Sequence, residues 1–142
     1  MLIAVDASVW VAAADPTDAC CAQSRACLAA ITRSGRGIVI PAFALVEVAC
    51  ALARRLHDPQ LGQRLAAAML NGPLVAHLPL EGPLLARARE RGAHAFLRGA
   101  DALYVAAAEA FAAPLLSWDR ELITRAGAIT PQDWLAETNA RS

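Results

Sequence analysis

The sequence predicts a single α/β domain spanning residues 1–142: a three-layer α/β/α sandwich around a central, mostly parallel sheet of about five short strands. Short continuous apolar runs alternate with longer segments of helical patterning, and strands covered on both faces of a parallel sheet give such runs. The chain has 142 residues, of which 57% are hydrophobic. A domain of this size can bury a core without disulfide or metal support.

The predicted strands are short apolar runs that end at a charged residue, a proline or a turn. The first ends at Asp6 and the second at Pro41. In chain order they cover residues 2–5, 37–40, 74–78, 114–117 and 128–130.

The predicted helices have recognisable start and stop residues. Asp15-Pro16-Thr17 precedes the first, and Asn71-Gly72-Pro73 follows the third. We interpret Gly99 as a break between two helices. The predicted helices cover residues 17–33, 43–56, 59–70, 82–96, 101–112 and 119–125, and Pro131 opens a last one.

The composition excludes several kinds of chemistry. All 13 basic residues are arginine, so lysine Schiff bases and a P-loop, which requires its lysine, are excluded. The formal net charge is zero, and nucleic-acid binding would therefore depend on a local arginine patch. The four cysteines form no Cys-x-x-Cys pair and the three histidines are far apart, so a zinc site is unsupported. We interpret the cysteines as small buried hydrophobic residues.

The apolar first segment is not predicted to be a targeting sequence. Asp6 interrupts it and no basic residue precedes it, unlike a signal peptide. No uncharged apolar run reaches about 18 residues, the length of a membrane span. We expect a cytoplasmic protein that does not enter a membrane.

Four carboxylates stand in apolar surroundings: Asp6, Glu47, Asp101 and Asp119. Asp6 and Asp119 follow the first and fourth predicted strands, so both should lie at the carboxyl edge of the sheet, where α/β sheets place their sites. Four converging carboxylates repel one another unless cations are bound. Oxygen ligands suit Mg²⁺ or Mn²⁺, and an acidic cluster without His or Cys indicates phosphodiester hydrolysis.

Each acid also has a structural interpretation. Asp6, Asp101 and Asp119 could cap a turn or a helix N-terminus. Glu47 is predicted to lie mid-helix, where capping is impossible, so its alternative is an ion pair with a distant arginine.

In their order and spacing, the segments around these acids resemble PIN-domain ribonucleases, and among them the VapC toxins of bacterial toxin–antitoxin pairs. The resemblance covers nearly the whole chain. The matching segments are Ile3-Ala4-Val5-Asp6-Ala7-Ser8, Ala44-Leu45-Val46-Glu47-Val48, Asp101-Ala102-Leu103-Tyr104-Val105-Ala106-Ala107-Ala108 and Leu115-Leu116-Ser117-Trp118-Asp119-Arg120-Glu121-Leu122.

The resemblance implies a PIN-like fold and a set of roles. The four acids would be catalytic, would hold Mg²⁺ or Mn²⁺, and would activate water to cleave single-stranded RNA. Ser8 and Ser117 occupy the places of small hydroxyl residues that orient a carboxylate or a water, although turn capping explains them equally well. Glu121 lies near the place of a further family acid, but glutamate is ordinary at a helix start.

The resemblance also implies partners: an RNA substrate, a small antitoxin protein and a second copy of the chain in a homodimer. The apolar stretch 10–14 could line a groove for the antitoxin, although core packing explains it as well. Arg87, Arg91 and Arg98, with Arg89, could contact RNA phosphates; the alternative is a solvated helix face.

Two other functions fit parts of the pattern. A binding module could retain the fold without catalysis, but it would be expected to lack at least one of the four acids. A phosphotransferase with Asp6 as nucleophile would usually need a second aspartate where Ser8 stands, and a lysine.

Overall fold

The computed structural model describes residues 1–142 and confirms the predicted parallel sheet. Four strands pair in the order β3-β2-β1-β4, all parallel. In register, Ile3 lies opposite Ile38, and Ala4 lies opposite Leu115 on the other side. The strands are β1 (Leu2–Val5), β2 (Gly37–Pro41), β3 (Val75–Leu78) and β4 (Leu115–Leu116).

The sheet has four strands rather than about five, because the last predicted strand forms only a single bridge. Ile129 pairs in parallel with Leu116, and its backbone N–H donates to the Leu115 carbonyl at 2.9 Å. Thr130 then caps the next helix, and Pro131 begins it. The chain has no room to extend the ladder before turning into that helix.

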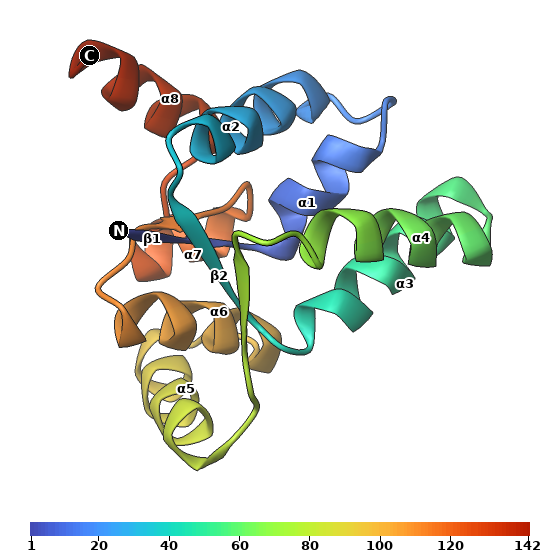
Figure 1. Ribbon diagram of the computed structural model, residues 1–142. Coiled ribbons are helices and arrows are strands. Elements are labelled where there is room, and N and C mark those ends of the chain that lie inside the picture. Colours follow the sequence, from blue (N-terminus) through green and yellow to red (C-terminus); the bar gives the residue numbers. More distant parts are fainter.

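Eight helices surround the sheet. In Figure 1, α2 and α8 lie on one side of β1 and β2, and α5 and α6 lie on the other. The helices are α1 (Ala7–Ala14), α2 (Cys21–Arg33), α3 (Ala44–Leu56), α4 (Pro59–Leu70), α5 (Gly82–Ala95), α6 (Gly99–Ala110), α7 (Arg120–Ala126) and α8 (Pro131–Ala140).

The predicted boundaries need two corrections. The helix expected over 17–33 begins only at Cys21, because Asp18 accepts a hydrogen bond from the Cys20 N–H at 2.7 Å and holds a turn there. Gly99 does not break the chain but is the first residue of α6, and Arg98 is the N-cap. A glycine is tolerated in a first turn, where fewer helical hydrogen bonds depend on it.

The segment after β1 forms a helix, α1, that no start or stop signal predicted. Its apolar residues belong to the core: Trp10 is 3% exposed and its indole N–H donates to the Val5 carbonyl at 3.3 Å. Of the two interpretations of residues 10–14, core packing is therefore the one that holds, since residues 10–13 are buried and Ala14 packs against the core.

The cysteines are all free, and only Cys27 is fully buried. Cys20 and Cys21 are half-buried and Cys50 is exposed, so the interpretation of all four as buried hydrophobic residues is correct only for Cys27. None of the helices is long and apolar enough to cross a membrane.

Helices α3 and α4 pack closely as a hairpin to the right of the sheet in Figure 1. The two helices approach each other closely at Gly62. A Cβ atom there would lie 2.6 Å from the Ala53 backbone nitrogen and 2.9 Å from the Ala49 carbonyl oxygen. Because those atoms belong to the backbone, they cannot move aside as a side chain could.

Replacing Gly62 by alanine should therefore destabilise the fold by about 1–3 kcal/mol, the usual effect of overpacking. Urea unfolding would measure the change. Gly82→Ala is the matched control, because a Cβ at Gly82 meets nothing within 4 Å. A Gly62→Ala protein as stable as the Gly82→Ala protein would contradict the close packing of α3 on α4.

Candidate functional site

The predicted acids lie at the carboxyl edge of the sheet. Asp6 follows β1 directly, and its backbone N–H donates to the Leu116 carbonyl of β4 at 2.9 Å. This bond joins the ends of the two strands, so the turn after β4, with Ser117 and Asp119, lies beside Asp6. In an open parallel sheet, this is the edge at which ligands bind.

Asp6 is a buried carboxylate held by two hydroxyl groups. The residue is 5% exposed. Its Oδ2 accepts hydrogen bonds from Ser8 Oγ at 2.7 Å and from Ser117 Oγ at 2.8 Å. Burial raises the pKa of Asp6, and the serine hydrogen bonds only partly oppose that effect. The carboxylate is therefore fixed in place, but its burial disfavours the charged form.

Ser8 and Ser117 also tie the two strand ends together. Ser8 Oγ accepts a hydrogen bond from the Trp118 N–H at 3.0 Å, and Ser117 Oγ accepts one from the Asp119 N–H at 2.9 Å. Each hydroxyl thus stabilises a turn and donates to Asp6 with the same oxygen, so the geometry is compatible with both interpretations of these serines.

Asp119 is the N-cap of α7. Its Oδ1 accepts hydrogen bonds from the N–H groups of Glu121 at 2.8 Å and Leu122 at 3.3 Å. Capping uses Oδ1, and Oδ2 remains available to other groups. Asp6 likewise caps α1 by accepting from the Ser8 N–H, so for both aspartates the capping interpretation and a place in the acidic cluster are compatible.

Asp101 lies in the first turn of α6 and does not act as its N-cap. Burial raises the pKa of Asp101, and the charges of Asp119 and Asp6 raise it further, while Arg98 opposes them. The capping alternative therefore fails for this residue. It stands within electrostatic reach of two other acids instead.

Glu47 lies in the first turn of α3 rather than mid-helix, because the preceding residues form the turn from β2. It has no arginine partner within salt-bridge distance. Its Oε1 accepts a hydrogen bond from the Tyr104 hydroxyl at 2.8 Å. Burial raises the pKa of Glu47, and the charges of Asp6 and Asp101 add to the effect. All four predicted acids are thus electrostatically coupled and form the acidic cluster, but only Asp101 and Asp119, together with Glu121, bring carboxylate oxygens within 4.8 Å of one another.

Two further residues lie at the cluster. Glu121, which the sequence places near a further acid of the family or as an ordinary helix-start residue, offers a carboxylate oxygen within 4.8 Å of those of Asp101 and Asp119. Tyr104, the only tyrosine, is buried on Glu47. Its position three residues after Asp101, on the same helix face, was the signal that could have indicated it.

The three arginines predicted to contact RNA fall into two groups. Arg87 and Arg91 pair with Glu109 across α5 and α6, at 3.9 and 2.6 Å. Arg98 lies at the acidic cluster itself, with its Nε 3.1 Å from Asp101 Oδ2 and its Nη2 3.1 Å from Asp119 Oδ2.

The donor set fits a hard divalent cation. The candidate ligand atoms are carboxylate oxygens, and no histidine or cysteine takes part. Burial is the main cause of the raised pKa values of Asp6, Glu47 and Asp101, and the charges of neighbouring acids add to it for Glu47 and Asp101. Mg²⁺ and Mn²⁺ are the cations that such oxygen-rich sites prefer.

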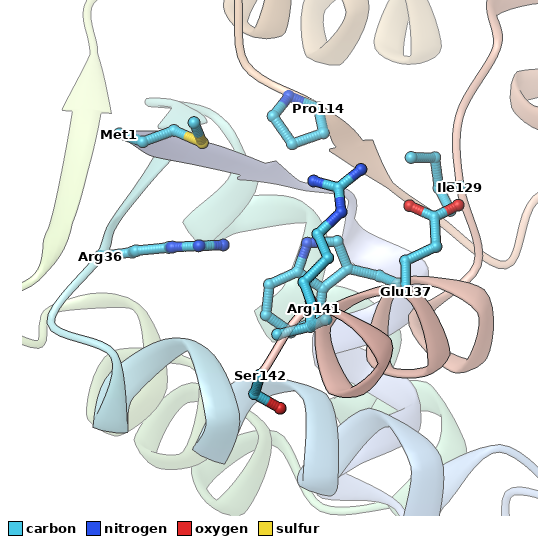
Figure 2. Close-up of a pocket in the computed structure, with 9 residues that line it drawn as sticks. Met1, Arg36, Pro114, Ile129, Glu137, Arg141 and Ser142 are labelled. Carbon is cyan, nitrogen blue, oxygen red and sulfur yellow. The ribbon is translucent and has the colours of Figure 1, made fainter.

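A cavity of about 390 Å³ lies at the opposite edge of the sheet. Figure 2 shows Met1, Arg36 and Pro114 around it. These residues directly precede β1, β2 and β4, respectively. None of the clustered acids lines this cavity, so it is not part of the candidate site.

Comparisons with known proteins agree with this geometry. Residues 3–128 match the PIN domain family. No curated protein matches the sequence. Among solved structures, VapC20 of Mycobacterium tuberculosis, a sarcin-ricin loop cleaving toxin, is 20% identical with a TM-score of 0.73, covering 89% of this chain and 96% of that one.

Two other solved structures have the same fold. PAE2754 of Pyrobaculum aerophilum is 22% identical with a TM-score of 0.72, over 99% of this chain and 90% of that one. VapBC2 of Rickettsia felis, bound to a DNA fragment from its promoter, is 13% identical with a TM-score of 0.69, over 92% and 97%. At these identities the likeness to solved structures shows the fold alone. The match to the PIN domain family spans residues 3–128, most of the chain, and the chain therefore belongs to that family.

Proposed function

We propose that this chain is a metal-dependent endoribonuclease that cleaves single-stranded RNA with an activated water, and that it is the toxin of a toxin–antitoxin pair. PIN domains are a nuclease family, which supports the general activity. The observation that carries the proposal is the cluster of Asp6, Glu47, Asp101 and Asp119 at the carboxyl edge of the sheet. Burial raises the pKa of Asp6, Glu47 and Asp101, and the charges of neighbouring acids raise that of Glu47 and Asp101 further.

Asp6, Asp101 and Asp119, with Glu47, would hold the cation. Mg²⁺ or Mn²⁺, when bound, would activate water and stabilise the charge that develops on the phosphate. The chain's own contribution is rigidity. Ser8 and Ser117 fix Asp6 Oδ2, and the N-terminus of α7 fixes Asp119 Oδ1, so the ligand oxygens need little rearrangement to receive a cation.

Glu47 is suited to handling a proton during the reaction. The Tyr104 hydroxyl binds Oε1, while Oε2 takes part in no protein hydrogen bond. The pKa of Glu47 is raised by burial and by Asp6 and Asp101, and a base is most effective when its pKa lies near the working pH. We propose that Oε2 accepts a proton from the attacking water.

Arg98 is the arginine best placed to contact the RNA, because it already lies at the acids. Arg87 and Arg91 remain 49% and 41% exposed although they pair with Glu109, and they could contact phosphates farther along the strand. With a net charge of zero, such local contacts would supply the attraction to RNA.

The toxin role rests on the fold likeness to VapC20 and VapBC2. With this role we propose two partners, a small antitoxin protein and a second copy of the chain in a homodimer. An apolar hollow of about 680 Å³ between α3 and α4 supports a protein partner. Val46 lines this hollow and is 64% exposed, so a partner seated there would cover it.

A cleavage assay tests the proposal. Purified chain, free of any partner, would be incubated with total RNA from its own host in Mg²⁺, in Mn²⁺ and in chelator, and new 5′ ends would be mapped. We expect discrete cuts that require metal. A folded protein that binds metal but makes no cuts would favour the alternative, a binding module that retains the fold. If the protein neither cleaves RNA nor binds metal, the acids have only structural roles, as helix caps and in turns.

Removing the Ser117 hydroxyl should lower cleavage by about 10–100-fold, the usual effect of losing a group that orients a metal ligand. Ser117 is fully buried, and Ser117→Ala would leave Asp6 Oδ2 held by Ser8 alone and would remove the acceptor of the Asp119 N–H. Initial cleavage rates at saturating metal would measure the effect. Ser34→Ala, which removes only a bond to the Ile31 carbonyl in α2, is the control. Equal rates in the two variants would show that Ser117 does not position the acids.

A further inference from the structure

Arg98 occupies the position of a cation in the acidic cluster. Its Nε lies 3.1 Å from Asp101 Oδ2 and 3.8 Å from Glu121 Oε2, and its Nη2 lies 3.1 Å from Asp119 Oδ2. Asp101, Asp119 and Glu121 are also the three residues whose carboxylate oxygens all lie within 4.8 Å of one another. One guanidinium therefore contacts every member of the group of oxygens best spaced to share an ion.

These contacts contribute little to the fold. The Arg98 side chain is 70% exposed, and exposed ion pairs are weak because water screens them. Arg98 is the N-cap residue of α6, but its side chain makes no capping hydrogen bond. What the Arg98 ion pairs do is balance the negative charges of Asp101, Asp119 and Glu121.

From this geometry we propose that Arg98 and the divalent cation compete for Asp101 and Asp119. Without metal, the guanidinium neutralises the cluster; metal binding displaces it from the carboxylates and leaves its donors free for an RNA phosphate. The inference rests on the proposed function, because it concerns the same site. It adds that the chain carries its own counter-ion, so metal affinity is set partly by the release of Arg98.

The competing view is that Arg98 is a permanent support that holds Asp101 and Asp119 in position for the metal. The two views predict opposite changes. Removing a support would weaken metal binding, because the ligands would lose their geometry. Removing a competitor would tighten it, because metal no longer has to displace the guanidinium.

Calorimetric titration with Mn²⁺ separates them. We expect Arg98→Gln to bind Mn²⁺ at least about 10-fold more tightly than the wild type, within the usual range for coupled binding events. Arg120→Gln is the matched control: Arg120 follows Asp119 in sequence but forms no salt bridge, so it reports the general effect of losing one positive charge. That variant should stay within about threefold of the wild type. Arg98→Lys, which keeps the charge but loses the forked donors, should fall between them.

A second readout needs no variant. Diamagnetic Mg²⁺ takes the place of Mn²⁺ in this NMR measurement. Saturating Mg²⁺ should shift the Nε–H resonance of Arg98 in the wild type relative to the metal-free protein. It should not shift that of Arg91, which is paired with Glu109. Unchanged or weaker metal binding in Arg98→Gln, or an Arg98 signal insensitive to Mg²⁺, would overturn the competition while leaving a metal-dependent nuclease intact. If neither the wild type nor Arg98→Gln binds metal, the proposed function fails as well.

Discussion

Replacing Asp6 by asparagine should abolish RNA cleavage and leave the metal-free protein at least as stable as the wild type. The loss of activity should exceed about 100-fold, since removing a direct ligand should cost more than removing a group that merely orients one. The fold should survive, because asparagine is as good an N-cap as aspartate, and its carbonyl oxygen can accept the hydrogen bonds of Ser8 and Ser117.

The stability gain follows from the direction of the pKa shift. Burial raises the pKa of Asp6 above its ordinary value of 3.8, so the folded state binds the proton more tightly than the unfolded state. Stability is therefore lost as the pH rises from 3.8 to the folded-state pKa, and it stays lower at neutral pH. Asparagine carries no charge, so the variant avoids that loss. Each 1 kcal/mol so relieved raises the melting temperature by about 4 °C.

Thermal unfolding in chelator between pH 3 and pH 8, beside the cleavage assay, would measure both effects. The stability difference should be largest at neutral pH and vanish under acidic conditions, where Asp6 is protonated. Asp58→Asn is the control, because Asp58 also caps a helix but is only half-buried, at the start of α4. Cleavage by the Asp6→Asn protein would disprove the site, and a loss of its stability at neutral pH would disprove the account of the pKa.

The fold could be predicted largely from local patterns. Each strand is a short apolar run with a clear end, as at Pro41 after Ile40, and short runs of this kind in a parallel sheet have few other interpretations. The length of the last run was overestimated because Pro131 starts α8 immediately after Thr130. Helix α1 was missed because its sequence is almost wholly apolar, and a helix buried on all sides has no amphipathic period to detect.

The site was predictable where a charge stands in an apolar context. Asp6, Glu47 and Asp101 are such residues, and burial does raise the pKa of all three. What the sequence could not show was their partners. The place of Arg98 depends on how the turn between α5 and α6 meets α7, and that of Tyr104 on how α6 meets α3, because each contact joins segments far apart in the chain.

Replacing Glu47 by glutamine should weaken metal binding and slow cleavage, both by at least about 10-fold. Glutamine keeps the shape of the side chain, and its carbonyl oxygen can still accept the hydrogen bond of Tyr104. The variant therefore removes charge and basicity and little else. Mn²⁺ titration and cleavage rates would measure the effect against Glu81→Gln, an exposed residue at the start of α5. Unchanged metal affinity together with an unchanged rate would exclude Glu47 from the site.

Tyr104→Phe extends the same argument to pH. The Tyr104 hydrogen bond lowers the pKa of Glu47 and so opposes the effect of burial. Phenylalanine removes that hydrogen bond while it preserves the ring packing on Phe43, so the pKa of Glu47 should rise further. The acidic limb of the cleavage profile should then move to higher pH, because Glu47 must lose its proton before it can act as a base or a ligand.

A wild-type protein and a Tyr104→Phe protein with superimposable pH profiles would show that Tyr104 serves packing alone. A shift in the Tyr104→Phe profile that disappears in the Glu47→Gln background would locate the effect in this one hydrogen bond, since a double-mutant cycle isolates the coupling between two groups in contact.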